Sequence, residues 1–360
     1  MRVLQIIDSL DAGGAERMAV NFANGLCNKI QFSGIVVTRK EGNLQNHLHK
    51  DVDYYFLNKK KNIDFDAIKK LKKIVVENKI EIIHAHGTSF FIVFLLKIVH
   101  SKIKIIYHEH YGNRANQSKY KNSILLFCLL FFNQILVVNK VLEKWFINFG
   151  FKKVNFFPNF TSFNQNDICE TKLLDQDGKR IILLANLKNP KNHILLLEAF
   201  NYLDLKRDNW SLHFVGKIFK DNYSEKILNF INKFNLNECV YLYDIKSDIK
   251  NILSQANIGV LCSTDEGFPV TLLEYGLAKL PVISSNVGFC PEIIIDKKNG
   301  LLFESNNVTD LSINLKSLIL NKNSQIQFGE NLHLLVKEKY SDEVVLKNYL
   351  VFLQNLTNTN

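Results

Sequence analysis

Residues 257–274, NIGVLCSTDEGFPVTLLE, place two glutamates eight positions apart around a turn between a predicted strand and a predicted helix. The apolar run 258–261 predicts a buried strand, and leucines at helical spacing follow the turn. In an open parallel sheet, ligands bind at the carboxyl ends of the strands, where this turn lies. Glu266 and Glu274 are therefore predicted to line a ligand site, where two carboxylates can hold sugar hydroxyls.

Strand and helix patterns alternate along the whole chain, which predicts an α/β protein with two doubly wound parallel sheets. A polar stretch, 161–179, separates the two alternating halves and predicts a linker. We expect an N-terminal domain over 1–160, a C-terminal domain over 161–340, and a last helix over 341–360 that packs back on the first domain. The predicted strands are 3–7, 34–38, 80–85, 104–108, 135–138, 180–184, 213–215, 240–242, 258–261 and 281–284.

Composition fits a two-domain globular protein, because 360 residues with 47% hydrophobic side chains can form two cores. The chain begins with a strand pattern instead of a secretory leader, so we expect a cytoplasmic protein. Six cysteines without C-x-x-C spacing predict neither disulfides nor a zinc site. The apolar stretch 124–138 is shorter than a membrane span and is interrupted by Asn133 and Gln134. It predicts a helix that mainly packs inside its domain, with contact at a membrane surface as the alternative.

The positive charge is concentrated in the first half of the chain. Residues 1–160 hold 24 Lys+Arg against 12 Asp+Glu, a net of +12, and the remainder of the chain has 21 against 23, a net of −2. One amphipathic helix carries Lys69, Lys70, Lys72 and Lys73, just after three further lysines at 59–61. Such a face predicts contact with an anionic membrane or an anionic acceptor, and a solvated surface is the alternative. No nucleic-acid-binding motif accompanies the charge.

Two histidine-rich segments follow predicted strands of the first half, so their side chains are expected at its ligand end. They contain His84 with His86, and His108 with His110. Alternate residues of an extended segment share a face, so each pair could bind a metal ion, although no scaffold of a zinc hydrolase is visible. The loop after the first strand contains Gly13 and Gly14 and opens a helix, which favours a phosphate close to the backbone.

Together these motifs resemble the retaining family 4 glycosyltransferases of bacterial surface-polysaccharide type. The resemblance rests on the E-x7-E pair, the GGAER loop over 13–17, the histidine strands, the FPN turn over 157–159 and Lys191. It implies the GT-B fold, two Rossmann-like domains facing a cleft. The implied activity is transfer of a sugar, of the hexosyl type, with retention of configuration. Asn186 stands where the family has an arginine, so Lys188 or Lys217 would have to supply that positive charge.

The resemblance also implies the roles of single residues. His108 and Glu266 would be catalytic, because both contact the transferred sugar. Glu274 would bind the nucleotide ribose, and Lys191 with the Gly13 and Gly14 amides would bind the diphosphate. Donor-binding residues would be Gly13, Gly14, Asn186, Lys191, Phe268, Pro269 and Glu274, and His84, His86 and His110 would lie on the acceptor side.

The implied partners are a nucleotide-sugar donor, with a UDP-sugar favoured and a GDP-sugar possible, and a glycan or lipid-linked acceptor. No metal and no cofactor is expected, and the protein would be peripheral on the cytoplasmic face of an anionic membrane. A metal-dependent transferase would use a D-x-D motif, which Asp51 and Asp53 formally supply. Two further alternatives are a sugar-nucleotide epimerase on the same scaffold and a non-catalytic subunit that binds a partner transferase.

Overall fold

The computed structural model describes residues 1–11, 13–163, 169–175 and 177–358. Within it the chain forms two compact units, Met1–Phe160 with Asp342–Asn360 (unit 1) and Thr161–Ser341 (unit 2). Part of the predicted linker, 164–168 and 176, lies outside the described residues, as does Ala12 of the glycine loop.

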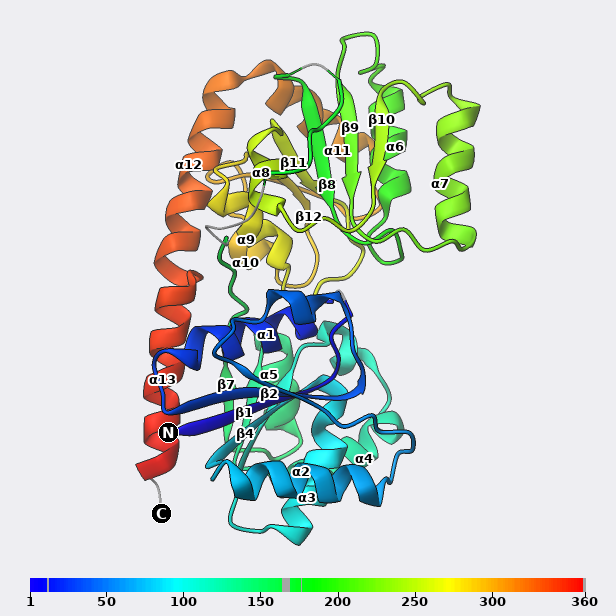
Figure 1. Cartoon of the computed structure of the whole chain (residues 1–360). Coiled ribbons are helices and arrows are strands. Elements are labelled where there is room, and N and C mark those ends of the chain that lie inside the picture. Colours follow the sequence, from blue (N-terminus) through cyan, green and yellow to red (C-terminus); the bar gives the residue numbers. More distant parts are fainter. Residues whose placement is uncertain (12, 164–168, 176, 359–360) are drawn as a thin grey trace. The chain divides into compact units, whose positions relative to one another are not determined.

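Unit 1 is built on a parallel seven-stranded sheet in the order β3-β2-β1-β4-β5-β6-β7 (Figure 1). The chain order reverses between β1 and β4, which makes this pair the point where ligands bind in such sheets. Its strands are β1 (Arg2–Ser9), β2 (Phe32–Lys40), β3 (Asp53–Phe56), β4 (Ile82–His86), β5 (Lys104–Glu109), β6 (Gln134–Val137) and β7 (Val154–Phe156). Its helices are α1 (Gly14–Cys27), α2 (Phe65–Glu77), α3 (Phe90–Val99), α4 (Lys119–Leu129), α5 (Lys140–Asn148) and α13 (Asp342–Asn358), with short 3-10 turns η1 (Asn43–His47), η2 (Gly87–Ser89) and η3 (Gly112–Asn116).

Unit 2 repeats this plan with a parallel six-stranded sheet in the order β10-β9-β8-β11-β12-β13. Here the order reverses between β8 and β11. Its strands are β8 (Arg180–Leu184), β9 (Ser211–Val215), β10 (Val240–Tyr243), β11 (Ile258–Leu261), β12 (Val282–Ser285) and β13 (Leu301–Phe303). Its helices are α6 (His193–Tyr202), α7 (Asn222–Lys233), α8 (Ile249–Ser254), α9 (Val270–Leu277), α10 (Cys290–Ile293), α11 (Val308–Leu320) and α12 (Lys322–Lys339).

The central strands form because helices cover both faces of each sheet, so unbroken apolar runs are stable there. All residues of β8 and β11 are buried. Polar side chains start several of the helices: Asp64 accepts from the Ala67 amide of α2, and Asn139 accepts from the Leu142 amide of α5. These caps fix where each loop after a strand ends, and the loops carry the polar residues of interest.

Helix α13 contributes to the core of unit 1, although the whole of unit 2 precedes it in the chain. Val345, Leu346, Tyr349 and Leu353 are buried with Phe22 of α1 in one apolar cluster. The Tyr349 hydroxyl also lies 2.8 Å from His84 Nδ1 of β4. Among the described residues, no helix is both long and apolar enough to cross a bilayer.

Candidate functional site

The clearest polar constellation of unit 2 is an ion pair between the loops after β8 and β11. Lys191 Nζ lies 2.6 Å from Glu266 Oε1, and the Ser263 hydroxyl donates to the same oxygen at 2.6 Å. The Thr264 amide donates to the Pro190 carbonyl at 2.9 Å, which ties the two loops together. Because β8 and β11 are neighbours at the reversal point of the sheet, the pair lies where an open α/β sheet binds ligands.

Glu266 is largely buried, with 8% of its side chain exposed, and Lys191 keeps 24% exposed. A buried carboxylate is stable when a cation and hydrogen-bond donors surround it. The arrangement therefore gives Glu266 a cationic partner and a hydrogen-bond donor, and it leaves Lys191 in contact with solvent, where an anionic group could approach it.

Gly288 fixes the backbone of Glu266 from the other side. Its φ of +53° lies in the left-handed region, and a Cβ on Gly288 would stand 1.7 Å from the Glu266 carbonyl oxygen. Only glycine satisfies both conditions. The loop after β12 therefore needs glycine at position 288 for its own turn and for its close contact with the Glu266 backbone.

We expect Gly288→Ala to destabilise unit 2 by more than the roughly 1–2 kcal/mol of left-handed strain alone, because the methyl group must displace backbone. The matched control is Gly178→Ala, which has a positive φ of +91° in the same unit but nothing within 4 Å of the added methyl. Urea unfolding of both variants measures the difference. Equal losses for the two glycines would show that contact with Glu266 does not matter.

The other predicted donor-binding residues of the E-x7-E stretch, Phe268, Pro269 and Glu274, are buried. Glu274 lies in α9 with 4% exposure. Phe268 stacks on Phe289 with ring centroids 4.7 Å apart, and Pro269 is buried at the start of α9. The two apolar residues therefore build the turn. Their predicted contact with a donor stays a prediction.

Asn186 supports the backbone of a neighbouring loop. Its side-chain oxygen accepts from the Lys217 amide at 3.0 Å. Lys188 and Lys217, the two lysines named as substitutes for the missing arginine, both lie near the Phe219 ring, at 5.9 and 5.2 Å from its centroid. The side chain of Asn186 thus supports this loop, two cations lie near the same Phe219 ring, and the predicted contact of Asn186 with a donor stays a prediction.

In unit 1, the glycine loop starts α1, with Gly13 as its N-terminal cap. A Cβ on Gly13 would stand 2.2 Å from Glu16 Oε2, whereas Gly14 has no atom within 4 Å of that position. The Glu16 carboxylate thus lies against Gly13, where it interacts favourably with the helix dipole. Gly14 is the open part of the loop.

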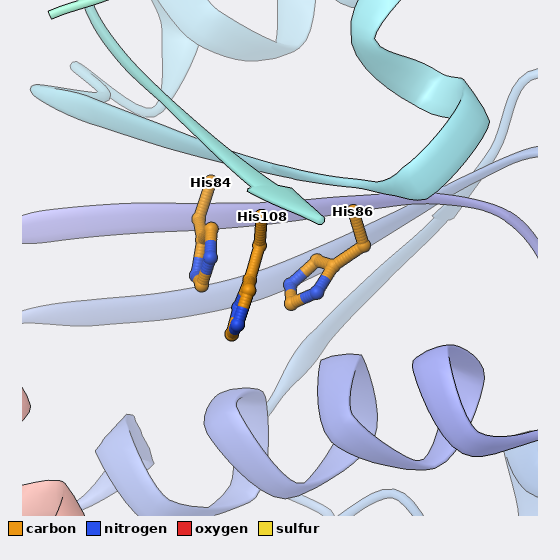
Figure 2. A group of neighbouring side chains, drawn as sticks. All are labelled: His84, His86 and His108. Atoms are coloured by element: carbon orange, nitrogen blue, oxygen red, sulfur yellow. The ribbon is translucent and has the colours of Figure 1, made fainter. Parts of the chain in front are cut away.

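The histidines form one buried group under the carboxyl ends of β4 and β5, and Figure 2 shows three of them side by side, pointing toward one helix. His84, His86 and His108 are all 0% exposed, while His110, just past the end of β5, is partly exposed. Burial and neighbouring histidines lower the pKa of His84, His86 and His108 well below the usual value, and burial lowers that of His110 to about 3. The group is therefore uncharged at neutral pH.

A hydrogen-bonded chain runs through this group toward His110. His86 Nε2 lies 2.9 Å from Gln5 Oε1, and His86 Nδ1 lies 3.0 Å from His110 Nε2. With the Gln5 oxygen accepting, His86 carries its proton on Nε2 and accepts from His110 Nε2. Neither ring nitrogen of His108 hydrogen-bonds another described residue.

His84, His86 and His108 are also candidate metal ligands, since their ligand atoms all lie within 4.8 Å of one another. An imidazole lone pair lies in the plane of its ring. The rings of His84 and His108 are stacked at 5.2 Å with planes 11° apart, so their lone pairs do not meet at one point. This geometry does not fit a shared ion. Asp53 of the D-x-D alternative lies at the first residue of β3, whereas metal-binding acids would be expected at strand carboxyl ends.

Sequence reasoning missed three participants: Ser263, Gln5 and the packing role of Gly288. Ser263 and Gln5 are common polar residues whose partners, Glu266 and His86, become neighbours only in the folded chain. Gly288 had a visible signal, the glycine in the loop 286–292, but its contact with Glu266 depends on the pairing of β11 with β12.

Comparison with known proteins covers nearly the whole chain. Residues 12–164 match the family model described as Glycosyltransferase Family 4, and residues 164–333 match the model described as Glycosyl transferases group 1. An uncharacterized glycosyltransferase of Haemophilus influenzae is 25% identical over 94% of this chain and 95% of its own length. The O-antigen biosynthesis glycosyltransferase WbnH of Escherichia coli is 28% identical over 83% of this chain and 85% of its own length.

A solved structure has the same fold. The crystal structure of Anabaena Alr3699/HepE in complex with UDP and glucose superposes with a TM-score of 0.84 at 14% identity, covering 99% of this chain and 100% of that one.

Proposed function

Because this chain belongs to the family 4 glycosyltransferases and has their GT-B fold, we propose that it transfers a sugar from a UDP-sugar to a lipid-linked glycan with retention of configuration. It is a glycosyltransferase of polysaccharide biosynthesis, like the O-antigen glycosyltransferase WbnH. The observation that carries the proposal is the Lys191–Glu266 pair at the reversal point of the unit 2 sheet.

The proposal gives each polar residue of unit 2 one task. Lys191, aided by the N-terminus of α6, stabilises the diphosphate as its bond to the anomeric carbon breaks. Glu266 accepts hydrogen bonds from the donor sugar, and Glu274 binds the ribose hydroxyls. The acceptor oxygen attacks from the face that the diphosphate leaves, and its proton passes to a phosphate oxygen, so no protein nucleophile and no metal is required.

In unit 1 the proposal places the acceptor and the transferred sugar at the carboxyl ends of β4 and β5. His108 and His110 share one face there, two residues apart. Since His108 is fully buried and His110 is partly exposed, we assign direct contact to His110 and the support beneath it to His108. His84 and His86 then lie beneath the acceptor. Gly14, which has no atom within 4 Å of a Cβ position, binds phosphate through its backbone amide.

Glu274→Ala is expected to weaken UDP binding by about tenfold or more, because charge-assisted hydrogen bonds to ribose contribute roughly 1.5–3 kcal/mol each. Calorimetry with UDP and GDP measures the affinity and shows which base is preferred. Glu338→Ala, an exposed acid of the same unit, is the matched control. UDP release with and without a lipid-linked acceptor, repeated with a chelator, tests the reaction and its independence of metal. Unchanged UDP affinity in folded Glu274→Ala would remove Glu274 from the site.

His110→Ala is expected to lower kcat by about ten- to a hundredfold with little change in UDP affinity, because it contacts the sugar and not the nucleotide. His108→Phe keeps the buried ring volume and should retain most of the turnover. The measurements are kcat with a competent acceptor and the UDP dissociation constant of each variant. A larger loss of kcat for His108→Phe than for His110→Ala would show that His108, and not His110, contacts the transferred sugar.

A further inference from the structure

Helix α4 exposes large apolar side chains on the face that points away from its own core. Its inner face packs through Leu125, Cys128 and Leu129, all buried. On the other side lie five exposed apolar residues, here called the α4 patch: Tyr120 (91% exposed), Ile124 (64%), Phe127 (57%), Leu130 (71%) and Phe131 (46%). The expectation that this segment mainly packs inside its domain holds for one face only.

The α4 patch is a continuous surface. Positions 120, 124, 127 and 131 recur at intervals of four, three and four, so they line one side of the helix and its final turn. Phe94 of α3 contacts both Phe127 and Phe131, with ring centroids 6.0 and 5.2 Å apart. Ile98 and Val99 at the end of α3 are also exposed. Isolated exposed apolar residues are normal, but a contiguous patch on two adjacent helices indicates an interaction surface.

The sequence around the patch is strongly basic. Residues 82–142 contain one acid, Glu109, which is fully buried. The same stretch contains seven basic residues: Lys97, Lys102, Lys104, Arg114, Lys119, Lys121 and Lys140. Helix α2, which lies beside α3 in Figure 1, adds four exposed lysines, Lys69, Lys70, Lys72 and Lys73, against two exposed acids, Asp66 and Glu77, of which Glu77 pairs with Lys73. Lys59, predicted as part of this basic face, is buried and does not belong to it.

An apolar patch with basic side chains around it favours one kind of binding partner. A second copy of the chain would bring two basic, acid-poor faces together, because a two-fold interface pairs a patch with itself. An anionic bilayer offers acyl chains to the apolar side chains and phosphate headgroups to the lysines. We propose that the α4 patch inserts into an anionic membrane, with the α2 lysines over the headgroups. The proposal rests on the proposed function in one respect, since it assumes a lipid-linked acceptor.

The position of α4 suits that acceptor. The helix follows β5, so its first turn, with Tyr120, starts on the side of the sheet where β5 ends and His110 lies. Insertion of this turn would bring the predicted acceptor side of unit 1 to the headgroup level.

The test uses the full chain and vesicles of phosphatidylcholine and phosphatidylglycerol at about 7:3, sedimented at ~0.1 M and ~1 M salt. The patch variant is Tyr120→Ser, Ile124→Gln and Leu130→Gln together. Its matched control is Leu320→Gln, Ile326→Gln and Leu334→Gln, which are 75%, 66% and 62% exposed in unit 2. A lysine variant changes the four α2 lysines to Gln.

We expect the patch variant to bind at least a hundredfold more weakly at both salt levels, because each large apolar side chain contributes about tenfold to partition. The lysine variant should lose binding at ~0.1 M salt but match the wild type at ~1 M, where charges are screened beyond ~3 Å. The control should bind like the wild type. In a chain that carries Ile124→Trp together with Trp145→Phe and Trp210→Phe, brominated lipid should quench the tryptophan fluorescence.

Equal binding of the patch variant and the wild type, or an unquenched Trp at 124, would overturn the inference. So would a wild-type dimer that the patch variant dissociates, since a second copy would then cover the face. Calorimetry with UDP separates this failure from that of the proposed function. UDP binding without vesicle binding would leave the transferase assignment intact, whereas absence of UDP binding would remove the proposed function first.

Discussion

Acidification from about pH 6.5 to about pH 5.5 is expected to cost unit 1 roughly 4 kcal/mol of unfolding free energy, about twice the cost to unit 2. The four histidines at the ends of β4 and β5, His84, His86, His108 and His110, have lowered pKa values and stay neutral in the folded state. In the unfolded chain each has a pKa near 6.5 and takes up a proton as the pH falls. Unfolding therefore binds protons in this window, and stability decreases with decreasing pH.

Unit 2 provides the internal comparison, because burial lowers the pKa of two of its histidines, His193 and His213, each to about 3. In unit 1, burial raises the pKa of Glu109, which protonates earlier in the folded state and offsets a small part of the loss. Arg114, paired with Glu109, stays charged throughout.

Each unit contains one tryptophan, Trp145 in unit 1 and Trp210 in unit 2, so fluorescence can follow each unit separately. Urea unfolding of Trp210→Phe, which reports on unit 1, and of Trp145→Phe, which reports on unit 2, gives the unfolding free energy of each unit at several pH values. The slope of this free energy against pH gives the number of protons that unfolding binds. His108→Phe should lower that number by one in unit 1. If the midpoint of unit 1 moves no more than that of unit 2, the histidines are not neutral in the folded state.

Lys191→Ala is expected to lower kcat by roughly 10²–10³-fold, the usual cost of removing one preorganised group that stabilises transition-state charge. The mutation also leaves Glu266 without its ion-pair partner. Lys191→Arg keeps the charge and should retain more activity. Lys250→Ala removes an exposed lysine of the same unit and should have no effect.

A double-mutant cycle separates the two possible roles of Lys191. If Lys191 acts on the diphosphate itself, Lys191→Ala remains costly in a chain that already carries Glu266→Gln. If it serves only to hold Glu266, the second mutation costs nothing further. Steady-state kinetics and UDP calorimetry on the four chains decide between them. Full activity of Lys191→Ala would remove the residue from the mechanism.

The parts of the fold that were predicted best are those set by local burial. β8 and β11 were predicted at their observed bounds, because an unbroken apolar run flanked by polar turns defines a central strand. β3, β7 and β13 were not among the predicted strands. They have only three or four residues each, and β-pairing with a neighbour, not sequence pattern, makes them strands.

The residues of the candidate site could be predicted from the sequence, but their contacts with one another could not. Strand ends identified Glu266 and the histidines, since chemistry in such sheets lies there. The burial of His84 depends on Tyr349, which is 265 residues later in the chain, and no local pattern predicts that contact. The salt bridge from Lys191 to Glu266 spans 75 residues for the same reason.

The crossing of α13 to unit 1 has a consequence for synthesis on the ribosome. Unit 2 is one continuous segment and can fold as soon as residue 341 has emerged. Unit 1 cannot complete its core until Val345, Tyr349 and Leu353 emerge and cover Phe22. Nascent domains usually fold in the order of translation. In this chain the first unit to be translated would be the last to complete its core, and until then the apolar side chains that α13 covers are exposed to chaperones.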